Sequence, residues 1–307
     1  MIGQRIDITL YTPHIMTKGI NDIFKGKWIV VEGPDRIGKS TLISNLKKTL
    51  YDDIYKRKKT TDVVVNGFPR RKTRIGTLLD KSLSNTITNP STSSTEMENV
   101  MSGETQTMLF LADMLDAMSE IKQRLEYGDI VITDRYIMST YAYALAQYPE
   151  ITREWICNAL SLMPLPDVFI YLTPKSNQNK KTTSISTSTS TSILDFVMKR
   201  AGFGDEKTER KEIQENVLRY MNELDTYKHK HKRRNSLGNV MQHWHYTRNV
   251  INDISERIIT LEIEEHMTPQ YICNDMCLPL LTSFLTEDSD RLHCPCSTPD
   301  ELMLVNT

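Results

Sequence analysis

A glycine-rich segment near the start of the chain has the residue types and spacing that hold the phosphate groups of a nucleotide. Residues 33–40 satisfy the pattern G-x4-G-K-S/T, directly after an apolar run and before a helix-like run. Its glycines let backbone N–H groups turn inward toward phosphate oxygens, and the positive end of the following helix adds attraction. Lys39 would bring a positive charge to the outer phosphates, and the Ser40 hydroxyl would ligate Mg²⁺. A glycine turn without a ligand is the alternative, but the complete pattern in this context favours phosphate binding.

Two further segments carry charges at the predicted carboxyl ends of strands. Asp134 and Arg135 follow one apolar run, and a basic loop at 68–76 follows another. Because ligands of parallel α/β sheets bind at the carboxyl ends of the strands, Asp134 can meet Mg²⁺ and Arg135 can reach transferring phosphates. Arginines in the loop suit an anion clamp because they bind phosphate in a bidentate way. The alternatives are an ordinary strand-end ion pair and a solvated charged loop.

Between residues 27 and 265, apolar runs alternate with segments of helical period, and this predicts the elements that position these residues. Five runs are predicted as strands, the last with the weakest pattern: 28–32, 62–65, 129–133, 167–172 and 240–246. Helical spacing of apolar residues predicts helices over 41–50 and 106–124. Strands rich in Val and Ile and separated by helices favour parallel pairing through right-handed crossovers. The fold class is therefore predicted as α/β, with three layers around a parallel sheet.

The composition limits the class of protein. The 307 residues include 38 Lys and Arg against 39 Asp and Glu, a net charge of −1 that excludes a globally basic nucleic-acid binder. Five cysteines, an odd number, form no disulfide scaffold and suit a reducing compartment. No apolar run is long enough for a membrane helix, and the N-terminus lacks a secretory signal. We therefore predict a cytoplasmic protein without a membrane partner. The basic run 228–234 is a nuclear signal, a nucleic-acid patch or a solvated connection, and the solvated connection is favoured.

Several segments fall outside the predicted domain at 27–265. Residues 1–26 form an N-terminal extension, and 266–307 form a C-terminal tail. Ser/Thr-rich stretches at 86–102 and 175–193 cannot bury enough apolar surface to offset their ordering entropy, so both are predicted as insertions. The tail contains four cysteines and a histidine whose spacing matches no common zinc module, so reduced thiols are favoured over a zinc site: Cys273, Cys277, His293, Cys294 and Cys296.

With these features together, the chain resembles the thymidylate kinases of the P-loop nucleoside-monophosphate kinase group. Five segments carry the resemblance in the order that the family has them: GPDRIGKST at 33–41, FPRRKTRIG at 68–76, DRYIMS at 134–139, LPDVFIYL at 165–172 and GFGDEKTER at 202–210. The resemblance implies a P-loop NTPase α/β/α sandwich with a five-stranded parallel sheet, a lid at about 194–212, and a homodimer. It also implies phosphorylation of dTMP by Mg-ATP, which gives dTDP for dTTP biosynthesis.

The resemblance also assigns roles to individual residues. Arg36 would be the catalytic arginine that eukaryotic-type members carry in the P-loop, and it would act with Lys39 and Arg135. The residues implied at the ATP phosphates are Gly33, Pro34, Asp35, Arg36, Ile37, Gly38, Lys39, Ser40 and Thr41. Those implied at dTMP are Asp35, which would hold the deoxyribose 3′-hydroxyl, Phe68, Arg71, Phe110, Arg135 and Tyr143. Ser40 and Asp134 would hold Mg²⁺.

The predicted helix at 106–124 departs from the family on the face that reads the base. Phe110 matches the residue that stacks on the base, but Met114 stands where the family has an arginine that hydrogen-bonds thymine. Thr140 also replaces a glycine. The lost charge-assisted hydrogen bond would weaken base selection by about 10–150-fold. The alternatives are therefore a kinase for another deoxynucleoside monophosphate or for a deoxynucleoside, and a nucleotide-binding protein with little or no turnover.

Overall fold

A single parallel sheet forms the centre of the molecule. The computed structural model describes residues 26–56, 61–83, 101–175, 210–231, 245–264 and 266–291. The sheet has five strands in the order β2-β3-β1-β4-β5, and every neighbouring pair runs parallel. The strands are β1 (Trp28–Glu32), β2 (Val63–Gly67), β3 (Ile130–Asp134), β4 (Val168–Pro174) and β5 (Ile258–Ile263). The predicted α/β class with a five-stranded parallel sheet is confirmed.

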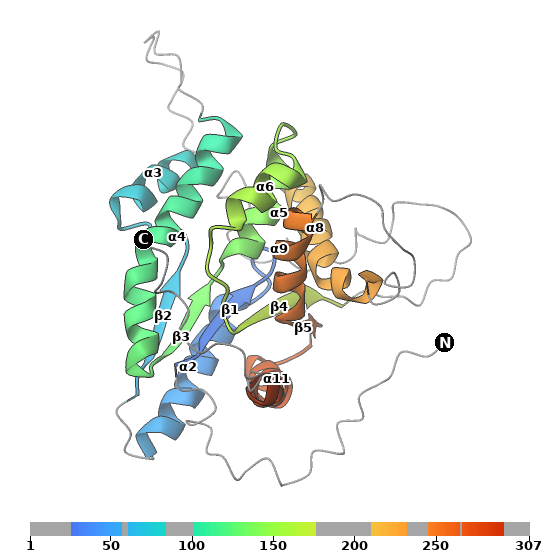
Figure 1. Ribbon diagram of the computed structural model, residues 1–307. Coiled ribbons are helices and arrows are strands. Elements are labelled where there is room, and N and C mark those ends of the chain that lie inside the picture. The colour runs from blue at the N-terminus through green and yellow to red at the C-terminus, as the bar shows by residue number, and fades with distance from the viewer. Residues whose placement is uncertain are drawn as a thin grey trace, which may run out of the picture.

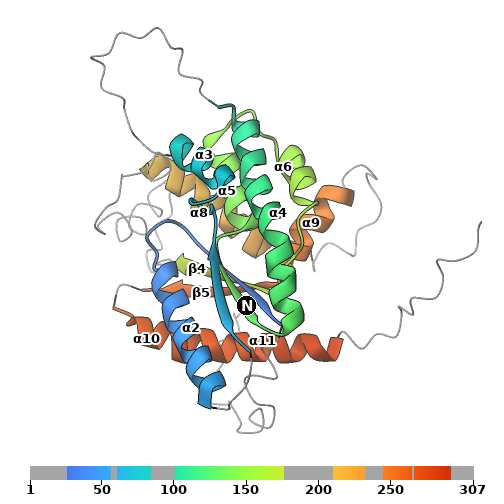
Figure 2. The same cartoon turned by 90° about the vertical axis from the view of Figure 1, so that its left-hand side faces the viewer.

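Helices cover both faces of the sheet, so the molecule has three layers (Figures 1 and 2). The helices are α2 (Lys39–Lys56), α3 (Arg74–Leu83), α4 (Gly103–Tyr127), α5 (Ile137–Gln147), α6 (Arg153–Leu160), α8 (Lys211–His231), α9 (His245–Glu256), α10 (Pro269–Tyr271), η6 (Ile272–Cys277) and α11 (Leu278–Arg291). One apolar core joins the sheet to α4, α5, α6, α8 and α9, and a second core joins its other face to α2, η6 and α11. Figure 1 shows α2 and α11 below the sheet and the other group above it.

The fifth strand lies at a different place from the predicted one. The pattern at 240–246 predicts a strand, but α9 begins at His245, and residues 240–244 lie outside the described part of the chain. The strand is Ile258–Ile263, which pairs with β4 from Phe169 to Pro174. The sequence pattern does not reveal this strand, because the apolar residues of helical period in α9, such as Val250 and Ile254, are followed almost directly by the alternating apolar residues of β5. The prediction of a strand at 240–246 is therefore wrong.

The chain beyond residue 265 packs into the second core. Cys273, Cys277, Leu281 and Leu285 recur every four residues, and this spacing places them on one helical face, where all four are buried. Burial raises the pKa of both cysteine thiols, so they behave as small apolar side chains. Residues that the sequence pattern places in a tail thus help to cover the sheet.

Some predicted features cannot be compared with the structure. The N-terminal extension up to residue 25, residues 84–100 and residues 176–209 lie outside the described ranges, as do His293, Cys294 and Cys296. Most of the predicted lid falls among them. Within the described ranges, no group of three or more His, Cys, Asp or Glu side chains is placed to hold a metal ion. Nor is any helix there both long and apolar enough to cross a bilayer.

Candidate active site

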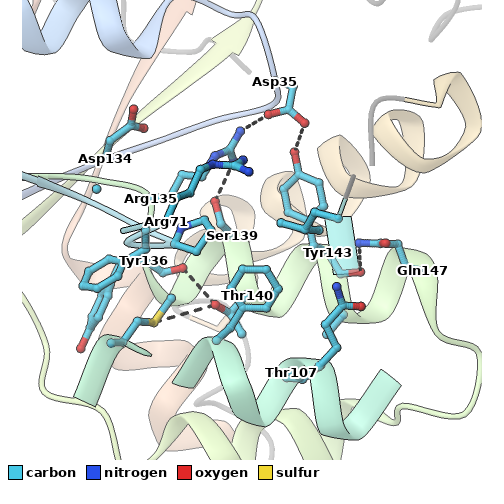
Figure 3. A pocket seen from close by; sticks show the side chains of 18 of the residues that line it. Asp35, Arg71, Thr107, Asp134, Arg135, Tyr136, Ser139, Thr140, Tyr143 and Gln147 are labelled. Carbon is cyan, nitrogen blue, oxygen red and sulfur yellow. Dashed lines mark hydrogen bonds and ion pairs between the residues drawn. The ribbon is translucent and has the colours of Figure 1, made fainter. Parts of the chain in front are cut away.

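A cavity of about 370 Å³ opens at the carboxyl ends of β1, β2 and β3. The glycine-rich loop lies between β1 and α2, the basic loop follows β2, and the pair of charges at 134–135 follows β3. The six residues that the resemblance assigns to the acceptor all line this cavity: Asp35, Phe68, Arg71, Phe110, Arg135 and Tyr143. Segments up to about a hundred residues apart in sequence therefore form one concave site (Figure 3).

The glycine-rich loop curls tightly over the sheet. Gly33 has a φ of 146°, and a Cβ there would lie 2.6 Å from the Leu172 carbonyl oxygen, so another residue would not fit. Arg36 holds a φ of 62°, a left-handed conformation that costs a non-glycine residue energy. The Lys39 ammonium turns back and donates hydrogen bonds to the carbonyl oxygens of Gly33 (3.0 Å) and Pro34 (2.7 Å). Lys39 and the curled backbone thus give the loop the shape of a cradle.

Arg135 joins the glycine-rich loop to the cavity. Its guanidinium pairs with the Asp35 carboxylate and donates to Ser139 Oγ (3.1 Å) and, at 3.4 Å, to the Gly33 carbonyl oxygen. The guanidinium also lies 5.3 Å from the centre of the Tyr143 ring. Figure 3 shows Asp35, Arg135 and Tyr143 converging from three elements. A single cation therefore touches the loop expected to hold ATP and the cavity expected to hold the acceptor.

Asp35 is held by further groups in addition to Arg135. The Tyr143 hydroxyl donates to Oδ2 (2.7 Å), and so does Gln214 Nε2 (2.8 Å), while the Asp35 backbone N–H donates to Gln214 Oε1 (3.1 Å). Burial alone would raise the Asp35 pKa, but the charges of Arg135 and Lys39 and these hydrogen bonds lower it. Asp35 is therefore an anion in a fixed orientation. Gln214, on α8, is a member of this site that sequence analysis does not single out.

Glu32 is a second residue of the site that the motifs do not reveal. It is the last residue of β1, is fully buried, and accepts hydrogen bonds from the backbone N–H groups of Tyr136 (2.8 Å) and Ser139 (3.2 Å) and from Ser139 Oγ (2.5 Å). Burial raises its pKa. Tyr136, the N-cap residue of α5, makes no side-chain cap bond. The Glu32 carboxylate at the end of β1 takes that role, since it accepts hydrogen bonds from backbone N–H groups at the start of the helix. An acidic residue inside an apolar strand end, directly before Gly33, is the signal that could have identified it.

Replacing Glu32 with glutamine is expected to lower the free energy of unfolding by about 1–3 kcal/mol, because one oxygen that accepts hydrogen bonds becomes a donor in a buried site. Urea unfolding followed by circular dichroism measures the change. Glu262→Gln is the matched control, since Glu262 is exposed on β5 and should change stability by less than about 0.5 kcal/mol. Equal effects at the two positions would contradict the capping role of Glu32.

The far end of the cavity is lined by neutral groups. Phe110 and Met114 come from α4 and Thr140 from α5, and the Thr140 hydroxyl lies 4.0 Å from the Met114 sulfur. Gln106 is held on both sides, because its amide donates to Ser82 Oγ (2.9 Å) and accepts from the Tyr148 hydroxyl. A flat aromatic base fits here by stacking and apolar contact.

Asp134 and Arg71 each offer a group that a ligand in the cavity could bind. Asp134 Oδ1 is buried and has no hydrogen-bond partner among the described residues, a costly state for a carboxylate oxygen. Arg71 lines the cavity near the strand ends and forms an ion pair with Asp80 that is about half exposed. An exposed pair of this kind is weak, so an incoming phosphate can compete with Asp80 for the guanidinium.

Comparisons with known proteins agree with this geometry. The profile of the family described as thymidylate kinase matches residues 31–238. The thymidylate kinase of Plasmodium falciparum is 32% identical over 68% of this chain and 79% of its own length, and that of Homo sapiens is 28% identical over 65% and 77%. The solved structure of the Candida albicans thymidylate kinase shares the fold, with a TM-score of 0.56 and 24% identity over 85% of this chain and 93% of that one. Because this profile covers more than half of the chain, the chain belongs to the thymidylate kinase family.

Proposed function

We propose that this thymidylate kinase transfers the γ-phosphoryl group of ATP to dTMP inside the cavity and uses the residues assembled there. The observation that carries the proposal is Arg135, which contacts Gly33 and Asp35 of the P-loop and also lines the acceptor cavity. An arginine in that place can stabilise the charge on a phosphoryl group as it passes between two nucleotides.

The reaction needs positioning and charge stabilisation more than proton transfer. An oxygen of the dTMP phosphate, largely a dianion at neutral pH, attacks the γ-phosphorus of ATP. A new P–O bond forms, the bond between the γ-phosphorus and the β–γ bridging oxygen breaks, and ADP leaves with that electron pair. In this proposal Lys39 holds the outer phosphates of ATP, Arg36 and Arg135 stabilise the transferring group, and Arg71 holds the acceptor phosphate.

The donor atoms near the P-loop fit Mg²⁺. Asp134 Oδ1 is buried without a partner among the described residues, and Ser40 stands in the first turn of α2. Mg²⁺ in kinases uses one or two carboxylates together with phosphate oxygens instead of an all-protein cage, which agrees with a single carboxylate here. When bound, the ion neutralises charge on the ATP phosphates.

The experiment that tests this function is ADP release at saturating Mg-ATP, measured with dTMP, dUMP, dCMP, dGMP and thymidine as acceptors. The proposal expects turnover with dTMP well above the rate without an acceptor. Because Met114 and Thr140 present neutral groups at the far end of the cavity, a second candidate function is phosphorylation of other deoxynucleoside monophosphates. ATP binding without turnover on any acceptor would contradict both.

We also propose a homodimer. Three exposed apolar side chains, Leu78 on α3 and Met108 and Leu115 on α4, support this proposal, since these two helices pack against each other. Sedimentation equilibrium of the protein with Leu78→Glu and Met108→Glu tests it. The variants should be monomeric if this face is the interface, whereas a variant that still dimerises would contradict the assignment.

The affinity for ATP is expected to fall above about pH 8. Burial and the nearby Arg135 charge lower the pKa of Lys39 to about 8. The negative charge of bound phosphates favours the protonated form of Lys39. Below pH 8 the lysine is already protonated, so ATP binds without proton uptake. Above pH 8 ATP binding must take up a proton, and the affinity falls by up to about tenfold per pH unit. Calorimetry in two buffers of different ionisation enthalpy between pH 7 and pH 9 measures both effects. In Lys39→Arg the pH dependence should flatten, and a constant wild-type affinity would contradict the assignment.

A further inference from the structure

An ion-pair cluster built around one buried carboxylate, Asp113, connects two walls of the cavity. Arg70 pairs with Asp113 and Asp116 of α4, and these three residues are called the Arg70 clamp below. We propose that the Arg70 clamp positions the acceptor nucleotide by fixing the basic loop at 68–73 against α4. The proposal rests on the proposed function insofar as the cavity holds a nucleoside monophosphate.

The clamp has more contacts than an ordinary surface ion pair. Asp113 is fully buried; its Oδ2 accepts a hydrogen bond from the Arg70 backbone N–H (2.7 Å) and its Oδ1 accepts from Arg70 Nε (3.0 Å). Arg70 Nη2 also donates to the Asp113 carbonyl oxygen (2.8 Å) and to Asp116 Oδ2 (2.6 Å). A loop and a helix 43 residues apart are thus joined through main chain and side chain at one point.

Hydrogen bonds and close packing tie the rest of the basic loop to Arg70. The Arg70 carbonyl oxygen accepts from the Thr73 backbone N–H (2.9 Å) and from Thr73 Oγ1 (3.0 Å), and Thr73 Oγ1 accepts from the Gly76 N–H (3.0 Å). A Cβ on Gly76 would lie 1.9 Å from the same carbonyl oxygen. The start of α3 therefore packs directly on Arg70, and the turn behaves as one rigid unit.

Each partner of the clamp is adjacent to residues that face the cavity. Phe68, Pro69 and Arg71 line the cavity from the loop, and Phe110 and Met114 line it from α4, whereas Arg70 and Asp113 are not among the lining residues. Figure 3 labels Arg71 beside Arg135 at this cavity. The clamp thus sets the distance between the arginine expected at the acceptor phosphate and the side chains expected at its base.

A positioning role makes a specific kinetic prediction. Misplacement of a substrate-holding group by about 1 Å costs on the order of 100-fold in rate or affinity. Arg70→Met, which keeps length and removes the charge, should raise KM for dTMP by about 10–100-fold. KM for ATP and the slow ATP hydrolysis without acceptor should stay within about twofold, because the four hydrogen bonds of the Arg70 clamp join the basic loop to α4 and not to the P-loop.

Stability and positioning can be separated with a second variant. Arg70→Met leaves Asp113 as a buried charge without its partner, which destabilises the fold whatever its role in binding. The double variant Arg70→Met/Asp113→Asn removes that charge and should recover most of the lost melting temperature. If the clamp positions the acceptor, KM for dTMP stays high in the double variant, since the three guanidinium hydrogen bonds between loop and helix are still missing and only the bond from the backbone N–H of residue 70 can remain. Lys122→Met, on the exposed side of α4, is the matched control and should change neither quantity.

The experiment measures KM for dTMP, KM for ATP, the calorimetric Kd for dTMP and the melting temperature of all four proteins. A raised KM and a raised Kd for dTMP in both Arg70 variants, with ATP parameters unchanged, support the proposal. Two results would overturn the proposal. In one, KM and Kd for dTMP recover in the double variant together with the melting temperature; in the other, they do not change in either Arg70 variant. Failure of the proposed function looks different, because the wild type itself would then release no ADP with dTMP.

Discussion

Replacing Arg36 with alanine is expected to lower kcat for dTMP phosphorylation by about 10³–10⁵-fold and to leave the Kd for ATP within a few-fold. An arginine at the transferring phosphoryl group acts mainly in the transition state, where negative charge is spread over three oxygens, and this is the range that such arginines contribute. Pre-steady-state ADP release measures kcat, and fluorescence titration with a nucleotide analogue measures binding.

The backbone of Arg36 needs its own control. Its φ of 62° costs alanine about 1–2 kcal/mol but costs glycine nothing, so Arg36→Gly separates the loss of the guanidinium from strain in the loop. Both variants should lose kcat equally. Arg36→Lys keeps the charge without the planar donor fork and should recover only part of the rate. A loss of less than about tenfold in Arg36→Gly would show that another group stabilises the transition state.

Replacing Arg135 with methionine is expected to damage both stability and catalysis. Asp35 would lose its charged partner in a site where each side chain is only 19% exposed, and the free energy of unfolding should fall by about 2–3 kcal/mol. The loss of a preorganised donor between the two nucleotides should lower kcat by about 10²–10³-fold. Tyr143→Phe removes one hydrogen bond from Asp35 without removing charge and should cost only about 1 kcal/mol.

The stability effect of Arg135→Met should also depend on pH. The lowered Asp35 pKa adds stability to the wild type above the ordinary aspartate pKa near 4, and that stability is lost as pH falls through the lowered value. The gap in unfolding free energy between wild type and Arg135→Met should therefore narrow below about pH 4. A gap that stays constant down to pH 3 would contradict the Arg135–Asp35 pairing.

Local patterns predicted the first four strands of the sheet well. The P-loop and β1 to β4 could be identified because each is a continuous segment whose spacing carries its own physical reason, and residues 28–32 form a strand as expected. The fifth strand at 258–263 was misplaced because α9 and β5 are both apolar and adjacent, so the change from helical period to alternation is hard to locate.

The residues that hold the site residues in place come from segments far apart in the sequence. Glu32 meets Ser139 across 107 residues, and Gln214 meets Asp35 across 179, so no local spacing marks either residue. Arg70 stood out only as one of several basic residues in its loop, and its buried partner Asp113 is what distinguishes it from them. Sequence patterns thus identify the groups that are expected to meet phosphate, whereas the fold is needed to identify the groups that hold them in place.

We propose that Arg36, Lys39 and Arg135 serve one phosphate cradle shared by two nucleotides. A ligand in which a polyphosphate chain joins adenosine to thymidine tests it directly by calorimetric titration in the presence of Mg²⁺. We expect this ligand to bind with a Kd far below those of ATP and dTMP alone, to compete with both, and to bind more weakly to Arg135→Met. A ligand that binds no tighter than ATP and competes only with ATP would contradict the shared cradle.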